Sequence, residues 1–394
     1  MKDYPLMKNN ITRSDLNKLI EYLKNDTSKI KLTSGSKVFN FEKKWSQWLG
    51  VKYSVFVNSG SSANFLTLKF LNKKFPEGGE VIVPPFTWNS DIVSIIDSGF
   101  KPVFCDISLN TLGLDENQIE KKITKNTVAV FLTHAQGFNA LTYKILKLCK
   151  KYNLILIEDA CESHGAVFDQ KKIGTYGLIS NFSFYYAHHL STIEGGMICT
   201  NNKEVYQFLL MLRGHGLLRE STDENFKKKI SKKYYDLNPK FIFIEKGYNM
   251  RSTELNAIIG LNQLKRLNMN IIKRNKNKKL FLDLLNEKHF YKDFNTNGMS
   301  NYAFNLVLKE NDQLLMKKIE KNLIKNSIEF RIGSAGGGNQ LRQPYIKNSN
   351  LKNIRYYDFK NTEHMHNYSM YIGNHPELTK KDISYIVNII NSSI

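Results

Sequence analysis

The sequence has few cysteines, few prolines and no long apolar stretch. Its four cysteines, Cys105, Cys149, Cys161 and Cys199, lie far apart and show no CxxC spacing. Neither a disulfide framework nor a zinc or iron–sulfur cage is therefore expected. No run approaches the roughly twenty apolar residues that a membrane helix needs, and the N-terminus MKDYPLMKNN lacks the apolar core of a signal peptide. These absences predict a cytoplasmic protein without a metal site or a membrane partner.

Acidic residues are outnumbered, because 36 Asp and Glu face 57 Lys and Arg, which gives a formal net charge of +21. Such a balance fits a nucleic-acid partner, an anionic small substrate or a Lys- and Asn-rich coding bias. The basic residues are scattered along the chain, and the densest stretches, 227–233 and 273–279, resemble solvated helix faces. No nucleic-acid motif accompanies them, so we expect no nucleic-acid partner.

The 394 residues suffice for two domains, and 41% of them are hydrophobic, as in folded proteins. Short apolar runs that alternate with helix-like segments predict strands at 53–58, 80–84, 101–106, 127–133, 154–158, 179–184 and 196–200. This alternation predicts an α/β domain with a mixed, mostly parallel sheet covered by helices on both faces. From about residue 266 the pattern changes to a long basic helix followed by mixed elements. We therefore predict a large domain over 1–265, including an N-terminal arm, and a smaller α+β domain over 266–394.

Two segments in the first half of the chain suit an anionic, aromatic ligand. After the first candidate strand, residues 59–64 read SGSSAN and lead into a helix, where free N–H groups, hydroxyls and the helix dipole favour a phosphate. The same small residues also serve as an ordinary helix cap. Asp159 follows the apolar strand 154–158, at the sheet edge where ligands bind in such folds. Its carboxylate would stabilise a protonated pyridine nitrogen or, alternatively, cap the next turn.

A third segment, SFYYAHHLSTIEGG, runs from Ser183 to Gly196. Together with Gly60, Ser61 and Asp159, in this order and spacing, it resembles the DegT/DnrJ/EryC1/StrS family of sugar-modifying enzymes that depend on pyridoxal 5'-phosphate (PLP). The resemblance covers nearly the whole chain and implies the aspartate aminotransferase type I fold. In that family the segment reads roughly S-F-x-x-x-K-x-x-x-x-x-E-G-G, and its lysine holds the cofactor as a Schiff base.

In this chain the position of that lysine is occupied by His188. No lysine occurs between Lys172 and Lys203, so the lysine has not shifted along the segment. Histidine cannot form an imine with PLP, but it carries protons near neutral pH. The chain therefore resembles the sugar 3-dehydratases of this family, which use free pyridoxamine 5'-phosphate (PMP).

Two types of these dehydratases are similar to this chain. The type that acts on GDP-4-keto-6-deoxy-D-mannose shares the paired histidines 188–189 and Glu162. The stretch 339–345, NQLRQPY, looks more like a CDP-linked type that carries a cysteine-bound [2Fe–2S] cluster. The cysteines for such a cluster are missing, so no iron–sulfur cluster is expected, whereas the nucleotide and the sugar stay open.

The resemblance also assigns roles to cofactor-binding residues. Gly60, Ser61 and Ser183 would hold the phosphate. Trp88 would stack on the pyridine ring, although a tryptophan there could also be ordinary core. Asp159 would pair with the ring nitrogen, and Glu162 would lie near the ring hydroxyl or the reacting amine.

The remaining roles concern the neighbouring subunit and the substrates. The stretch 247–251 matches the family's G-Y-N-x-R motif, in which Asn249 reaches the phosphate of the partner, so a homodimer with shared sites is expected. Arg251 would hold the carboxylate of glutamate as amino donor. His215 is a second pocket candidate, and Arg331 and Arg342 would close over a nucleotide diphosphate.

The activity implied is removal of the C3 hydroxyl from a nucleotide-linked 4-keto-6-deoxy sugar, with His188 moving the proton and glutamate restoring PMP. Such a lyase would serve dideoxysugar synthesis for surface polysaccharide, such as the O-antigen of lipopolysaccharide. A PLP-dependent nucleotide-sugar aminotransferase is one alternative, but it needs a lysine at position 188. An inactive fold that acts as a scaffold or binds nucleic acid is another.

Overall fold

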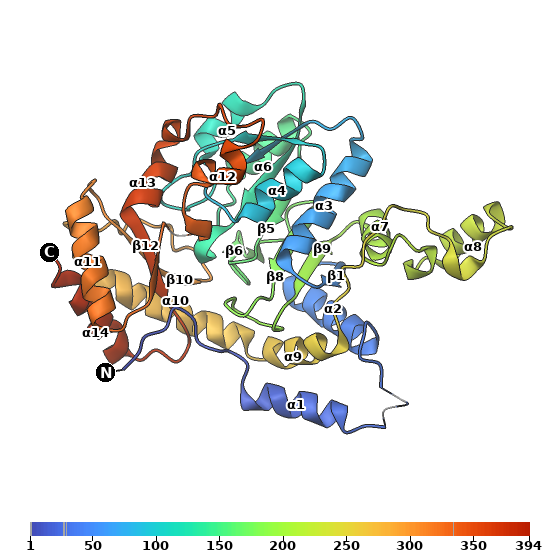
Figure 1. The fold of residues 1–394 in the computed structure, drawn as a ribbon, viewed down its shortest axis with the longest axis horizontal. Helices are drawn as coiled ribbons and strands as arrows, with labels where there is room; N and C mark the ends of the chain where they lie inside the picture. The colour runs from blue at the N-terminus through green and yellow to red at the C-terminus, as the bar shows by residue number, and fades with distance from the viewer. Residues whose placement is uncertain (1, 27, 29, 334) are drawn as a thin grey trace.

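The structure is a computed structural model that describes residues 2–26, 28, 30–333 and 335–394. Within these residues, a seven-stranded mixed sheet in the order β1-β9-β8-β5-β4-β2-β3 lies at the centre (Figure 1). Its strands are β1 (Tyr53–Val57), β2 (Glu80–Val83), β3 (Lys101–Phe104), β4 (Thr127–Thr133), β5 (Ile155–Asp159), β8 (Ile179–Ser183) and β9 (Gly196–Thr200). Only β9 runs against its neighbours, β1 and β8, in this sheet of described strands. The predicted α/β fold and its seven strands are confirmed, each within two residues at either end.

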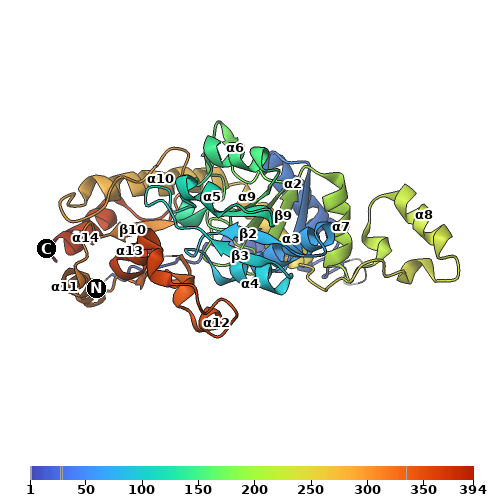
Figure 2. The same cartoon turned by 90° about the horizontal axis from the view of Figure 1, so that it is seen from above.

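Helices cover both faces of this sheet, as the alternation of apolar strand residues requires. Val81 and Val83 of β2 pack toward one layer, whereas Ile82 between them packs toward the other. The first layer holds α3 (Gly60–Lys74), α4 (Asn89–Asp97) and α7 (Lys203–Arg213). The second holds α2 (Ser36–Leu49), α5 (Glu116–Lys122), α6 (Tyr143–Lys151) and α9 (Glu254–Leu264). Figure 2 shows α4 and α6 on opposite sides of β2 and β3.

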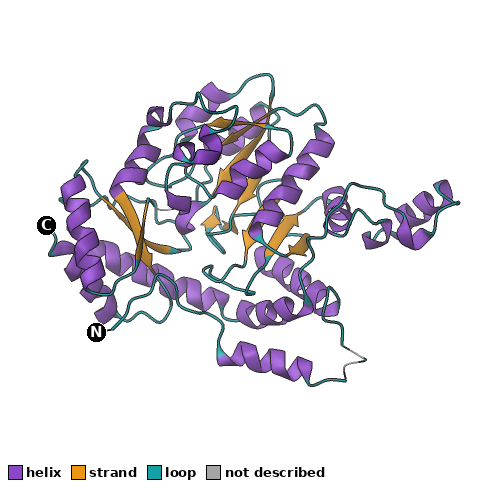
Figure 3. Ribbon diagram, in the orientation of Figure 1, coloured by secondary structure: helices purple, strands orange, loops and turns teal. Residues whose placement is uncertain are grey.

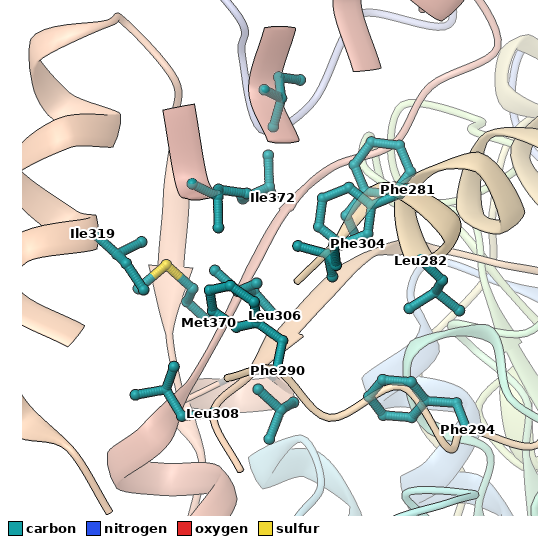
Figure 4. Close-up of a cluster of buried hydrophobic side chains, with 14 of the residues drawn as sticks. Phe281, Leu282, Phe290, Phe294, Phe304, Leu306, Leu308, Ile319, Met370 and Ile372 are labelled. Atoms are coloured by element: carbon teal, nitrogen blue, oxygen red, sulfur yellow. The ribbon is translucent and has the colours of Figure 1, made fainter. Parts of the chain in front are cut away.

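A second, antiparallel sheet of β10 (Ala303–Val307), β12 (Ser369–Gly373) and β11 (Phe330–Ile332) lies apart from the first (Figure 3). The helices around it are α10 (Leu267–Leu284), α11 (Gln313–Lys325), α13 (Lys360–Tyr368) and α14 (Lys380–Asn391). Their apolar faces meet in one core, in which Phe281 stacks on Phe304 with ring centroids 4.5 Å apart (Figure 4). The same core includes Phe86 and Phe138, which lie beside the first sheet, so it joins the two sheets.

The chain crosses between the two sheets more than once. The chain begins beside the second sheet, where Tyr4 forms a β-bridge with Ile328. It then reaches the first part of the molecule, where α1 (Arg13–Leu23) packs on α9. In the opposite sense, α12 (Pro344–Lys347) and its flanks pack against α4 and the first sheet. The boundary at residue 265 stays a prediction, and residues on both sides of it cross to the other sheet.

Two peripheral features complete the fold. Residues 224–243, with α8 (Glu224–Lys233), extend away from the body and expose Tyr235 and Phe243 (Figure 1). The short strands β6 (Val167–Phe168) and β7 (Lys171–Lys172) form a small hairpin. Among the described residues, no helix combines the length and the apolar character needed to cross a membrane.

Candidate active site

A cavity of about 450 Å³ opens at the carboxyl ends of β4, β5 and β8, against the edge of the second sheet. Such ends are the usual ligand crevice of open α/β sheets. The cavity is lined by eight of the predicted residues: Gly60, Ser61, Trp88, Asp159, Glu162, Ser183, His188 and, from β11, Arg331. Residues far apart in the sequence thus converge because their strands are neighbours in the sheet.

The N-terminus of α3 forms one end of the cavity. Ser59 caps the helix by accepting the N–H of Ser62 at 3.0 Å, which leaves the first N–H groups of the helix, those of Gly60 and Ser61, without intrahelical partners. A Cβ on Gly60 would lie 2.6 Å from the Cβ of Ser183. Only glycine therefore lets the end of β8 bring the Ser183 hydroxyl beside these donors. Free N–H groups, a hydroxyl and the helix dipole together form an anion site.

A buried acidic pair lies at the floor of the cavity. Asn64 of α3 donates to both Asp91 and Asp159 at 2.8 Å, and the backbone N–H of Cys161 donates to Asp159 at 2.9 Å. Burial and the neighbouring Asp159 raise the pKa of Asp91 well above its usual range, although hydroxyl donors, among them Thr133 at 2.8 Å, oppose the shift. Burial and repulsion thus disfavour the charged form of Asp91 beside Asp159.

Asp159 is 5% exposed and has no cationic partner within the part of the chain that the structure describes. A buried carboxylate without a cation is costly. A protonated pyridine nitrogen in the cavity would supply the missing charge, so this floor fits the ring of a PLP-type cofactor. The alternative role, a cap of the next turn, accounts for one contact of Asp159, the N–H donated by Cys161.

Glu162 lies on the loop after β5, on the wall of the cavity. Its carboxylate accepts the backbone N–H of Gln136 at 2.7 Å and the side-chain amide of the same residue at 3.3 Å. Burial raises the pKa of Glu162 to about 7 despite these donors, and Asp159 adds to the increase. Glu162 can therefore change its protonation near neutral pH.

His188 faces the cavity from the loop after β8. Its backbone is fixed on both sides, because its N–H donates to the carbonyl of Tyr185 and Asn10 donates to its carbonyl, each at 3.0 Å. Burial, with a smaller contribution from Arg274, lowers the pKa of His188 to about 3. The imidazole is neutral at physiological pH and able to accept a proton. No lysine is among the described residues that line the cavity.

His189, next in the chain, turns away from the cavity. Its Nε2 lies 3.0 Å from the carbonyl of Ser300 and 3.2 Å from that of Asn301. These contacts give the second histidine a packing role between the two sheets.

Aromatic side chains form the remaining walls. Trp88, the N-cap residue of α4, leaves 53% of its surface exposed beside the cavity. An exposed tryptophan at a cavity of this kind offers a flat face for stacking. Tyr302 and Tyr371 approach from the second sheet, and the Tyr302 ring centroid lies 5.7 Å from that of His188.

Four predicted residues lie outside this cavity. His215 and Asn249 are exposed, and Arg251 pairs with Glu220 at 2.8 Å. Arg342 forms a bidentate contact with Glu363, from Nη2 to Oε2 at 2.6 Å and from Nε to Oε1 at 2.9 Å, and stacks on Tyr356, so within one chain its guanidinium is already engaged. Their predicted roles are not met within a single subunit and stay predictions.

Sequence reasoning missed several residues of the site. Asn64, which is bonded to both Asp91 and Asp159, helps to hold Asp159 in place. Asn64 lies one turn into α3 and Asp91 lies three residues after Trp88, and these positions could have indicated that both face the site. Tyr302 and Tyr371 carried no such signal, because only the packing of the second sheet on the first brings them to the cavity.

Comparisons with known proteins agree with this geometry. The model of the DegT/DnrJ/EryC1/StrS aminotransferase family matches residues 10–391. A GDP-4-keto-6-deoxy-D-mannose 3-dehydratase of Escherichia coli is 32% identical over 370 residues, which are 91% of this chain and 92% of that protein.

Solved structures give the same result. The E. coli GDP-4-keto-6-deoxy-D-mannose-3-dehydratase with bound hydrated PLP superposes with a TM-score of 0.86 at 30% identity, covering 99% of this chain and 100% of that one. A GDP-4-keto-6-deoxymannose-3-dehydratase with a trapped PLP-glutamate adduct gives 0.85 at 30% identity, covering 98% and 100%.

The fold and the site are thus those of the PLP-dependent sugar enzymes with the aspartate aminotransferase type fold. The chain belongs to the DegT/DnrJ/EryC1/StrS aminotransferase family.

Proposed function

We propose that the protein is a PMP-dependent 3-dehydratase that removes the C3 hydroxyl of a nucleotide-linked 4-keto-6-deoxy sugar. GDP-4-keto-6-deoxy-D-mannose is the first substrate to test, because relatives at about 30% identity act on it. The observation that carries the proposal is the imidazole of His188 in a cavity whose described lining contains no lysine. An aminotransferase of this family needs a lysine at that position.

The residues of the cavity fit the cofactor. The donors at Gly60, Ser61 and Ser183 suit its phosphate, the carboxylate of Asp159 suits its ring nitrogen, and the face of Trp88 suits its ring. When bound, PMP supplies a primary amine that condenses with the C4 ketone of the sugar and a ring that accepts electrons.

The neutral imidazole of His188 accepts a proton from the cofactor carbon that bears this amine. The same imidazole then donates that proton to the C3 hydroxyl, which leaves as water. The side chain of Asp159 would pair with the ring nitrogen and favour its protonated form.

Glutamate is the proposed amino donor that restores PMP, and Arg251 of a second subunit is the proposed ligand of its carboxylate. The exposed positions of His215 and Asn249 support a homodimer in which each subunit completes the site of the other. A cytosolic location and a role in dideoxysugar synthesis for surface polysaccharide belong to the same proposal.

Mixing two inactive variants tests the shared site. If Asn249 acts in the partner's cavity, His188→Asn and Asn249→Ala chains form heterodimers with one intact site. Random reassortment should then restore about a quarter of the wild-type rate. A mixture as inactive as its parents would contradict sharing.

The reaction itself is tested with purified protein, PMP, glutamate and GDP-, CDP- and UDP-linked 4-keto-6-deoxy sugars. We expect 2-oxoglutarate and ammonia in equal amounts and a sugar that is lighter by one oxygen atom. A 4-amino sugar that retains its C3 oxygen, without release of ammonia, would instead identify an aminotransferase.

A further inference from the structure

A lysine is fully buried behind the active site. Lys278 of α10 has no exposed surface, and its Nζ lies 4.9 Å from the centre of the Phe294 ring, with Phe138 and Phe281 slightly farther away. No carboxylate pairs with it among the residues that the structure describes. Burial lowers the pKa of Lys278 to about 7. Keeping an unpaired amine in an apolar core is costly, which calls for a reason.

The hydrogen-bonded partner of Lys278 leads toward the cavity. Its Nζ donates to the side-chain oxygen of Asn305 on β10 at 3.1 Å, and the amide nitrogen of Asn305 donates to the side-chain oxygen of Gln136 at 3.2 Å. The amide nitrogen of Gln136 then donates to Glu162 at 3.3 Å. Lys278, Asn305 and Gln136 form a buried relay that ends on a carboxylate of the active site.

The direction of this relay is set at its lysine end. A carboxamide can turn over and exchange its donor and its acceptor, whereas the ammonium form of Lys278, which prevails below a pH of about 7, only donates. Lys278 therefore requires Asn305 to turn its oxygen toward Lys278 and its NH₂ group toward Gln136. Gln136 is then obliged to present its own NH₂ group to Glu162.

We propose that Lys278 is a positioning residue for Glu162, acting through the amides of Asn305 and Gln136 to aim an N–H donor at the carboxylate. Without Lys278, both amides can turn over, and Gln136 can present its oxygen instead. An oxygen acceptor favours the protonated carboxyl, which donates, over the carboxylate, which does not. Loss of Lys278 thus raises the pH at which Glu162 ionises.

Other ionisable groups also face Glu162, and none of them changes when Lys278 is replaced. Asp159 and Cys161 lie on its own segment, and Tyr302 and Tyr371 face it from the second sheet. His188 and Arg331 line the same cavity.

The test is the dissociation constant of PMP, measured by fluorescence between pH 5.5 and 9, because a carboxyl group beside the cofactor alters its affinity on ionising. In a plot of log Kd against pH, we expect the wild type to show an inflection near pH 7, and we expect Glu162→Gln to remove it. Lys278→Met should move this inflection upward by about half to one pH unit, the size expected for one hydrogen bond. The exposed neighbour on the same helix provides a matched control, Lys279→Met, which should leave it unchanged.

Two further variants separate positioning from a structural effect. Asn305→Asp can still accept from Lys278 but cannot donate to Gln136, so it should shift the inflection in the same direction. In the Glu162→Gln background, Lys278→Met should change nothing. Because the amine has no carboxylate partner, we expect methionine at 278 to keep or raise Tm.

The inference rests on the proposed cofactor site and not on the sugar substrate. Failure of the wild type to bind PMP would overturn the proposed function and this inference together. PMP binding with an inflection that Glu162→Gln does not remove, or that Lys278→Met does not move, would overturn the relay alone.

Discussion

Replacing Asp159 by asparagine tests the floor of the site. The carboxylate is 5% exposed, is held by Asn64 and by the backbone of Cys161, and lacks a cationic partner among the described residues. The Asp159→Asn amide keeps the shape and loses the charge. A hydrogen bond to a charged group contributes about 1.5–3 kcal/mol, which corresponds to roughly a 10- to 150-fold weaker Kd for the cofactor.

The assay is titration of the cofactor-free protein with PLP and with PMP, followed by absorbance and by tryptophan fluorescence. Asp97→Asn, on the exposed end of α4, is the matched control and should bind as the wild type does. Without cofactor, Asp159→Asn should unfold at the same or a higher temperature, because a buried unpaired charge has been removed. A Kd within twofold of the wild type would refute the assignment of Asp159 to the ring nitrogen.

Three further predictions concern His188, the buried histidines and a buried ion pair. His188→Lys should gain a borohydride-reducible bond to PLP and lose deoxygenation, measured by intact mass and by product analysis; unchanged deoxygenation would place the proton carrier elsewhere. Burial lowers the pKa of His164, with His188 nearby, so unfolding takes up a proton and stability falls as pH drops below about 6.5. The free energy of unfolding, measured with urea, should therefore fall less steeply between pH 7 and 5 for His164→Asn than for the wild type. The difference in slope should be about 1.4 kcal/mol per pH unit, and the exposed control His215→Asn should match the wild type. Arg213→Met should destabilise the fold by about 3–5 kcal/mol in the same assay, because it leaves Glu42 buried without its partner at 2.6 Å; a loss under 1 kcal/mol would show that Glu42 is neutral there.

The first sheet and the floor of the site were predictable because their signals are local. Each strand is a short apolar run, and Gly60, Asp159 and Ser183 stand where strands of that sheet end. The carboxyl ends of parallel strands lie at the same edge of a sheet. Residues that directly follow such strands can therefore be predicted to lie close together from their order in the sequence.

The rest of the site depends on contacts that no local pattern encodes. Tyr302, Tyr371 and Arg331 reach the cavity only because the second sheet packs beside the first. The relay from Lys278 to Glu162 joins elements more than 100 residues apart, and Lys278 lies in a stretch that the sequence alone made look like a solvated basic helix face. That interpretation was wrong for Lys278, because the Asn305 amide and three aromatic rings enclose it.

The central claim is that no lysine of this chain anchors the cofactor. Mass spectrometry of the wild-type protein after incubation with PLP and reduction with borohydride tests it most directly. We expect the mass of the unmodified chain, together with free reduced cofactor, because His188 cannot form the reducible bond. A stoichiometric mass gain that maps to one lysine would contradict the account.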